Sequence, residues 1–95
     1  MIIRLMGDAQ YRVDDGLRER LDVLDGEAMT ALEAGDEKTM DAHLTEMWRL
    51  VQTEGELLPA DDLHPSDALI PPADLSLEET GQLFAEDGLI PDLPA

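Results

Sequence analysis

The amino-acid sequence predicts a mostly α-helical domain with a minor β component. Two amphipathic stretches fill residues 14–55, and a Gly-Asp pair separates them. Two short β-favouring runs lie in the first 13 residues, and all six prolines follow residue 55. We therefore expect one domain over residues 1–95. Its parts are a short β-hairpin (1–13), an antiparallel helical hairpin (14–55), a proline-rich extended segment that wraps around it (56–75) and a third helix (76–88).

The β-hairpin prediction depends on residues 2–6 (IIRLM) and 11–13 (YRV), which are rich in β-branched, aliphatic and aromatic side chains. The turn-forming stretch 7–10 (GDAQ) separates them. An isolated hairpin is only marginally stable in water, so this one is expected to pack against the rest of the chain.

The two central helices are predicted from helical spacing of apolar residues and from capping residues. Asp14 or Asp15 caps the first helix, and Gly35 ends it. Asp36 caps the second helix, and Gly55 ends it. The first apolar stripe consists of Leu17, Leu21, Leu24, Ala28, Ala31 and Leu32, and the second of Met40, Leu44, Met47, Trp48 and Val51. Each stripe covers about 100° of its helix, which is typical of a helix that packs on one neighbour.

The C-terminal third combines prolines with regularly placed leucines and isoleucines. Proline prevents helix formation over 56–75, but a purely flexible linker would not hold so many apolar residues. We expect this segment to close the core of the helical hairpin. Ser76 and Glu79 form a capping box that starts the third helix, and Gly88 ends it.

The charge of the chain is strongly negative, with 23 acidic residues against 6 Lys and Arg and a formal net charge of −17. Such a surface repels nucleic acids and anionic membranes, so a charged partner is expected to be basic. Solubility in a salty cytoplasm would explain the same charge. Cysteine is absent, which excludes disulfides and thiolate metal sites. We find no signal peptide and no apolar run of about 18–20 residues, and we expect a cytoplasmic protein without direct membrane insertion.

The sequence offers little for catalysis. It has no glycine-rich phosphate loop. His43 has acidic neighbours but no second histidine at ligand spacing, and is better explained as a residue at the edge of the helix stripe. Ser66 and Ser76 are explained as turn and cap residues. We expect no enzymatic activity, no metal and no cofactor.

Partner binding is the better hypothesis, and six apolar residues are candidates for it. Trp48 and Met47 belong to a helical stripe, so packing in the core is their first interpretation. The alternative is an exposed anchor for a partner helix, since Trp and Met are favoured at interfaces. The candidate partner-binding residues are Trp48, Met47, Leu83, Phe84, Leu89 and Ile90.

Three segments together resemble the PspA-associated domain family. The first is 1–13 (MIIRLMGDAQYRV), and the second is 32–37 (LEAGDE) at the turn between the helices. The third is the C-terminal pattern 57–59 (LLP), 65–67 (PSD), 70–72 (IPP) and 88–91 (GLIP). The resemblance implies a small trihelical domain without catalytic residues. It also implies an association with PspA, a coiled-coil protein that protects stressed membranes in the phage-shock (envelope-stress) response.

Several functions remain open from the sequence. The first is an adaptor or regulator of a PspA-type coiled coil, reaching the membrane only through that partner. The others are a transcription-linked regulator, which the lack of a basic face disfavours, an acidic inhibitor that mimics nucleic acid, and a small enzyme. A homodimer is compatible with the thin core of a chain this short.

Overall fold

The computed structural model describes residues 1–61, 65–83 and 89. The elements in chain order are β1 (Ile2–Leu5), β2 (Gln10–Arg12), α1 (Asp15–Glu33), α2 (Glu37–Glu54), β3 (Glu56–Leu57), β4 (Ala68–Ile70) and α3 (Leu77–Leu83).

The N-terminal β-hairpin is confirmed. β1 and β2 pair antiparallel, with Ile3 opposite Tyr11. Gly7 adopts a positive φ of 87° in the turn, a conformation that side chains with a Cβ atom disfavour. Because side chains alternate along a strand, Ile3, Leu5 and Tyr11 all point to the buried face.

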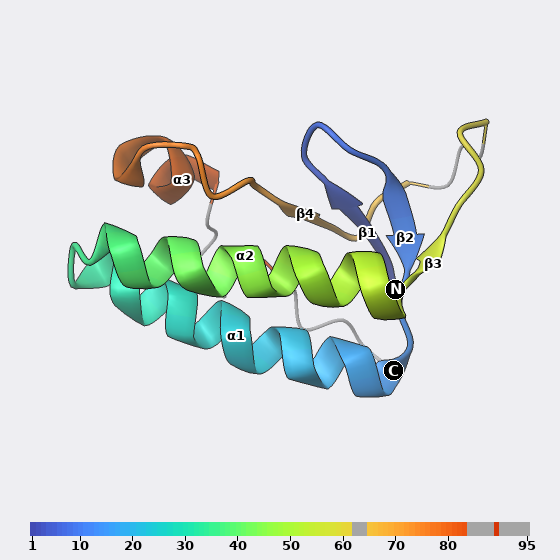
Figure 1. Cartoon of the computed structure of the whole chain (residues 1–95), viewed down its shortest axis with the longest axis horizontal. Helices are drawn as coiled ribbons and strands as arrows, with labels where there is room; N and C mark the ends of the chain where they lie inside the picture. Colours follow the sequence, from blue (N-terminus) through green and yellow to red (C-terminus); the bar gives the residue numbers. More distant parts are fainter. Residues whose placement is uncertain (62–64, 84–88, 90–95) are drawn as a thin grey trace.

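The antiparallel helical hairpin is also confirmed, and its caps are those expected (Figure 1). The Asp14 carboxylate accepts a hydrogen bond from the Leu17 N–H at 2.8 Å. The Asp36 carboxylate accepts one from the Thr39 N–H at 3.2 Å. Gly35 stands between the helices with a φ of 73°, so it supplies the left-handed residue that ends α1.

The predicted fold class needs a correction, because the proline-rich segment contributes two strands. β3 pairs antiparallel with β2, and β4 pairs parallel with β1. The result is a mixed four-stranded sheet of order β3-β2-β1-β4. About 54% of the described residues are helical and about 15% lie in strands, so the fold is α+β rather than mostly α.

The missed strand β4 is short and has prolines on both sides. A segment of three residues is too short to show the alternation of apolar and polar side chains that predicts a strand. β4 forms because β1 offers a free edge: the Met6 N–H donates to the Ile70 carbonyl at 3.0 Å, and the Asp67 N–H donates to the Ile2 carbonyl at 2.8 Å. Partners more than 60 residues apart in the chain therefore decide its structure.

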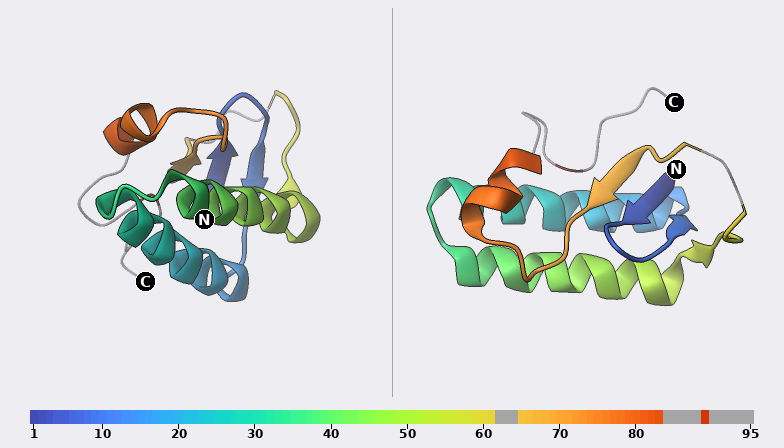
Figure 2. Two further views of the ribbon diagram at one scale, coloured as in Figure 1. Left: turned by 60° about the vertical axis from the view of Figure 1, so that its left-hand side comes forward. Right: turned by 90° about the horizontal axis from the view of Figure 1, so that it is seen from above.

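The elements form two layers (Figures 1 and 2). α1 and α2 pack side by side, and the sheet lies against α2. Aliphatic side chains from both layers make the core. Its buried members are Ile3, Leu5, Tyr11, Val13, Leu17, Leu21, Ala28, Ala31, Met40, Leu44, Met47, Leu50, Val51, Ala68, Ile70 and Leu89.

The third helix begins where the capping box predicted. The Glu79 N–H donates to Ser76 Oγ at 3.1 Å, and the Ser76 N–H donates to the Glu79 carboxylate at 3.2 Å. α3 packs against α1 near the turn between α1 and α2. The close approach is visible at Gly81, where an added Cβ would lie 3.5 Å from Leu32 Cδ1. The predicted continuation of this helix over 84–88 lies outside the described residues.

Candidate functional site: a tryptophan-lined groove on α2

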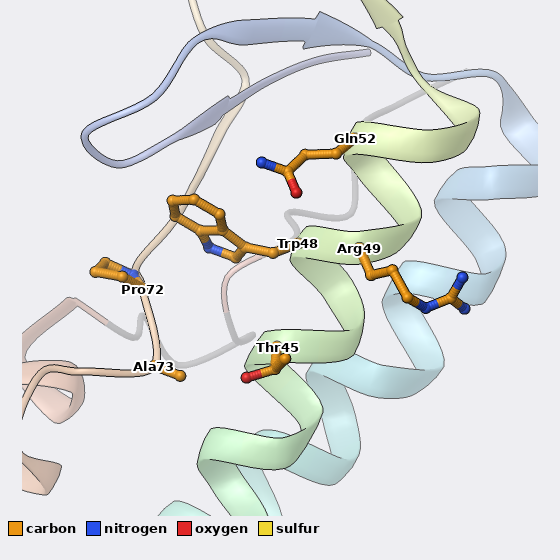
Figure 3. A pocket seen from close by; sticks show the side chains of 6 residues that line it. All are labelled: Thr45, Trp48, Arg49, Gln52, Pro72 and Ala73. Carbon is orange, nitrogen blue, oxygen red and sulfur yellow. The ribbon is translucent and has the colours of Figure 1, made fainter.

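One face of α2 turns away from α1 and carries the site. Asp41, Thr45, Trp48 and Gln52 follow each other at intervals of four, three and four residues, which places them in one stripe. The segment that leaves β4 runs across this stripe. Its residues Pro72 and Ala73 form the opposite wall of a shallow groove of about 370 Å³ (Figure 3). The full lining is Thr45, Trp48, Arg49, Gln52, Pro72 and Ala73.

Trp48 is fixed within the groove. Its indole Nε1–H donates to the Pro71 carbonyl at 2.9 Å, so the polar atom of the ring is satisfied within the protein. The side chain is only partly buried, and Figure 3 shows the ring between α2 and the Pro72 segment. A preorganised aromatic ring loses little conformational entropy when a partner packs on it. Trp48 thus has the properties of an interface anchor as well as of a core residue.

Polar contacts lie on the rim of the groove, and Gln52 links this rim to the β-hairpin. Arg49 forms an ion pair with Glu46, and this hydrogen-bonded guanidinium lowers the pKa of the Glu46 carboxyl. The Gln52 amide donates to Asp8 Oδ2 at 3.4 Å, and the Tyr11 hydroxyl donates to the same oxygen at 3.1 Å. Burial, and then the hydrogen bond to Asp8, raise the pKa of Tyr11. These contacts hold the rim in place and leave the apolar wall open.

The opposite end of the stripe is acidic. Asp41 lies one helical turn before Thr45, and its Oδ1 is buried without a hydrogen-bond partner among the described residues. Burial, and then the charge of Glu37, raise the pKa of Asp41. Glu37 itself accepts a hydrogen bond from the Leu77 N–H at 2.9 Å, which ties the start of α3 to α2.

The structure separates the six residues predicted to bind a partner. Trp48 lines the groove. Met47 is 0% exposed and packs in the core, which agrees with its first interpretation, so it offers no surface to a partner. Leu83 is 37% exposed on α3, away from the groove lining. Leu89 is buried, so it offers no surface. Phe84 and Ile90 lie outside the described residues.

Asp25 is a structurally important residue that the sequence reasoning missed. It is 1% exposed, and its Oδ1 accepts a hydrogen bond from the Leu89 N–H at 2.8 Å. The signal was present: Asp25 lies between Leu21 and Ala28 in the apolar stripe of α1, where a charged residue requires a partner. The aspartate anchors residue 89, 64 positions further along the chain, to α1.

A second hollow of about 370 Å³ lies between α1 and α2, at the end of the hairpin near Gly35. Here His43 Nε2 lies 2.5 Å from the Glu27 carboxylate, and His43 Nδ1 lies 2.8 Å from the Thr39 carbonyl. The hydrogen bond to Thr39, and then the contact with Glu27, raise the pKa of His43, while partial burial opposes them. No three His, Asp or Glu side chains within the described ranges converge as a metal site requires. His43 therefore acts as a link between the two helices.

The fold and the groove define a small acidic α+β domain with a tryptophan-lined face. Residues 1–92 match the model of the family described as PspA-Associated protein, and the chain belongs to that family. No curated protein and no solved structure has a significant match to it. The three helices implied by the family resemblance are present, and the sheet adds to them. Within the described part of the chain, no helix has the length and apolar character needed to cross a membrane.

Proposed function

We propose that this protein is a non-enzymatic adaptor or regulator that binds a PspA-type coiled-coil protein of the envelope-stress response through the Trp48 groove. Its family membership supports the choice of partner. The open apolar wall beside a fixed tryptophan supports the choice of surface. In this proposal the protein acts in the cytoplasm and reaches the membrane only through its partner.

The groove has the shape and chemistry for docking a helix. A long coiled coil exposes ridges of side chains, and a helix can lay such a ridge into an apolar groove of another protein. Tryptophan is enriched among the residues that contribute most to binding, and the hydrogen bond from Trp48 to Pro71 fixes it before the partner arrives. Pro72 and Ala73 add apolar surface without long side chains to be ordered.

The charge of the chain favours a basic partner. At −17 the protein attracts basic surfaces over a distance set by the salt concentration, about 10 Å at 0.1 M. This attraction increases the rate of association more than the strength of the final complex. We therefore expect binding to weaken as salt rises but to persist, because the apolar contact with Trp48 is not screened.

The test measures binding of the purified protein to the purified full-length PspA-type protein from the same source. Thr45→Arg places a long side chain in the groove at an exposed helix position, where it should leave folding intact. Thr30→Arg makes the same change at an exposed position of α1, which lines the second hollow and lies outside the Trp48 groove, and is the matched control.

We expect Thr45→Arg to raise the dissociation constant about tenfold or more, which corresponds to about 1.4 kcal/mol. Thr30→Arg should change it less than about threefold, as expected of a rim charge. Equal losses in both variants would assign the effect to net charge and remove the groove from the proposal. No binding of the unmodified protein at either low or high salt would refute the adaptor function itself.

A further inference from the structure

The wall of the Trp48 groove (72–73) is held on both sides along the chain, between β4 and α3 (Figure 1). On the side of β4, the Trp48 indole N–H donates to the Pro71 carbonyl at 2.9 Å. On the other side α3 begins at Leu77, whose N–H donates to the Glu37 carboxylate of α2 at 2.9 Å. Leu77 is the fourth residue after the wall, and four residues span at most about 14 Å. The docking position of α3 therefore limits where the wall can lie.

The attachment of α3 itself is weak. Apart from the approach of Gly81 to Leu32, this helix of seven residues makes no extensive contact with any described helix or strand. Its one buried side chain is that of Thr80, which is 0% exposed. Thr80 Oγ1 has no hydrogen-bond partner among the described residues, and burying such a hydroxyl costs free energy. Leu83, the last residue of α3, is 37% exposed and adds little apolar burial.

We propose that α3 is a reversible clasp, which holds the groove wall in place when it docks on the α1–α2 hairpin and lets the wall move away from Trp48 when it is released. Thr80 is then a positioning residue, which touches no partner and sets the geometry of the surface that does. This inference rests on the proposed function and specifies how its binding surface is formed and lost.

The population of docked α3 sets the affinity of the groove. A partner that binds only the docked form has an apparent dissociation constant equal to the intrinsic one divided by the docked fraction. A variant in which α3 is docked for about one tenth of the time therefore binds about tenfold more weakly. Segments with few buried contacts open at free energies well below that of the whole domain, so α3 should open while α1 and α2 stay folded.

Amide hydrogen exchange of the unmodified protein tests whether α3 opens independently. The Thr80 N–H donates to the Ser76 carbonyl at 2.9 Å and reports opening of α3. The amide of Leu44, a fully buried residue of α2, reports unfolding of the hairpin. Corrected for intrinsic rates, exchange at Thr80 should be at least about 30-fold faster than at Leu44. Equal protection would overturn the clasp, because α3 would then open only with the whole domain.

Three variants change α3 at positions outside the helical hairpin. Thr80→Asp places a charge at the buried position and should release α3, because an unpaired buried charge is strongly unfavourable. Thr80→Val replaces the unpaired hydroxyl with a methyl group of similar size and should favour docking. Gln82→Asp adds the same charge at an exposed position of α3 and is the matched control.

Quenching of Trp48 fluorescence by acrylamide reports how far the wall covers the ring and requires no partner, since Trp48 is the only tryptophan of the chain. We expect Thr80→Asp to increase quenching and to raise the dissociation constant for the full-length PspA-type protein about tenfold. Gln82→Asp should change that constant less than about threefold. Thr80→Val should slow exchange in α3 about fivefold and bind at least as tightly as the unmodified protein.

The outcomes separate this inference from the proposed function. Release of α3 in Thr80→Asp with unchanged quenching and affinity would show that α3 does not hold the wall. Loss of the helical circular dichroism of α1 and α2 in this variant would show that α3 belongs to the core and is no clasp. Unchanged exchange in Thr80→Val would overturn the role of the hydroxyl. The predicted exchange and quenching, in a protein that does not bind the PspA-type protein, would support the clasp and refute that choice of partner.

Discussion

The buried carboxylate of Asp25 gives the sharpest test of how Leu89 is held against α1. Asp25→Ala removes the acceptor of the Leu89 N–H, and the 2.8 Å bond is lost. A hydrogen bond to a charged group contributes about 1.5–3 kcal/mol, and the buried N–H would be left without a partner. Relief from burying a charge offsets part of this loss. We expect Asp25→Ala to lower the free energy of unfolding by about 2 kcal/mol.

Urea unfolding followed by circular dichroism and by Trp48 fluorescence measures this loss. In a domain of this size, 2 kcal/mol corresponds to a fall in Tm of roughly 8–16 °C. Asp25→Asn keeps an acceptor oxygen and should lose about half as much. Asp22→Ala, at an exposed position of the same helix, should change stability by less than about 0.5 kcal/mol.

An Asp25→Ala variant as stable as Asp22→Ala would contradict this prediction. In that case the hydrogen bond to Leu89 makes no net contribution to the free energy of unfolding, because the cost of burying the carboxylate cancels it. A loss in Asp25→Asn equal to that in Asp25→Ala would show that the charge, and not the acceptor geometry, holds residue 89 against the helix.

Three further predictions concern the end of α2, the contact between α1 and α2, and the cap of α3. Gly55→Ala places a Cβ 2.5 Å from the Val51 carbonyl, so the end of α2 must shift; we expect a loss of about 2 kcal/mol in urea unfolding, and an unchanged midpoint would contradict this geometry. The hydrogen bond to the Thr39 carbonyl, and then the contact with Glu27, raise the pKa of His43 above its ordinary 6.5. These contacts therefore stabilise the fold fully below about pH 6.5, and the gain disappears as pH rises through the folded-state pKa. Unfolding free energies between pH 6 and 8.5 should therefore fall more in the unmodified protein than in Glu27→Gln, and parallel curves would exclude the link. Ser76→Ala removes the cap of α3 and should cost about 1 kcal/mol, visible as faster amide exchange at Thr80, whereas unchanged exchange there would show that tertiary packing alone holds the helix.

Much of the local structure could be predicted from the sequence because it depends on neighbours in the chain. The caps Asp14, Asp36 and Ser76 act within three residues, and the helices follow from apolar spacing of three and four. The N-terminal hairpin likewise joins strands separated by a short turn. Family membership could also be predicted, because the order of several short segments carries it.

The candidate site could be predicted only in part. The sequence marks Trp48 as a candidate partner-binding residue, but it marks Met47 in the same helical stripe as well. Periodicity alone does not tell which edge of such a stripe reaches solvent. The opposite wall of the groove comes from Pro72, 24 residues further along the chain, and the bond from Trp48 to the Pro71 carbonyl forms only in the folded molecule. The groove therefore has no signature in any single segment.

The sequence by itself determined the helical hairpin, the caps, the acidic surface and the family. The tertiary structure decided the rest: that the proline-rich segment adds β4 to the edge of β1, that Asp25 bonds Leu89, and that Trp48 rather than Met47 faces a groove. The physical reason is how far apart in the chain the interacting residues lie. Capping and helical spacing are set by residues within one or two turns, whereas strand addition, buried polar pairs and grooves depend on which distant segments pack together.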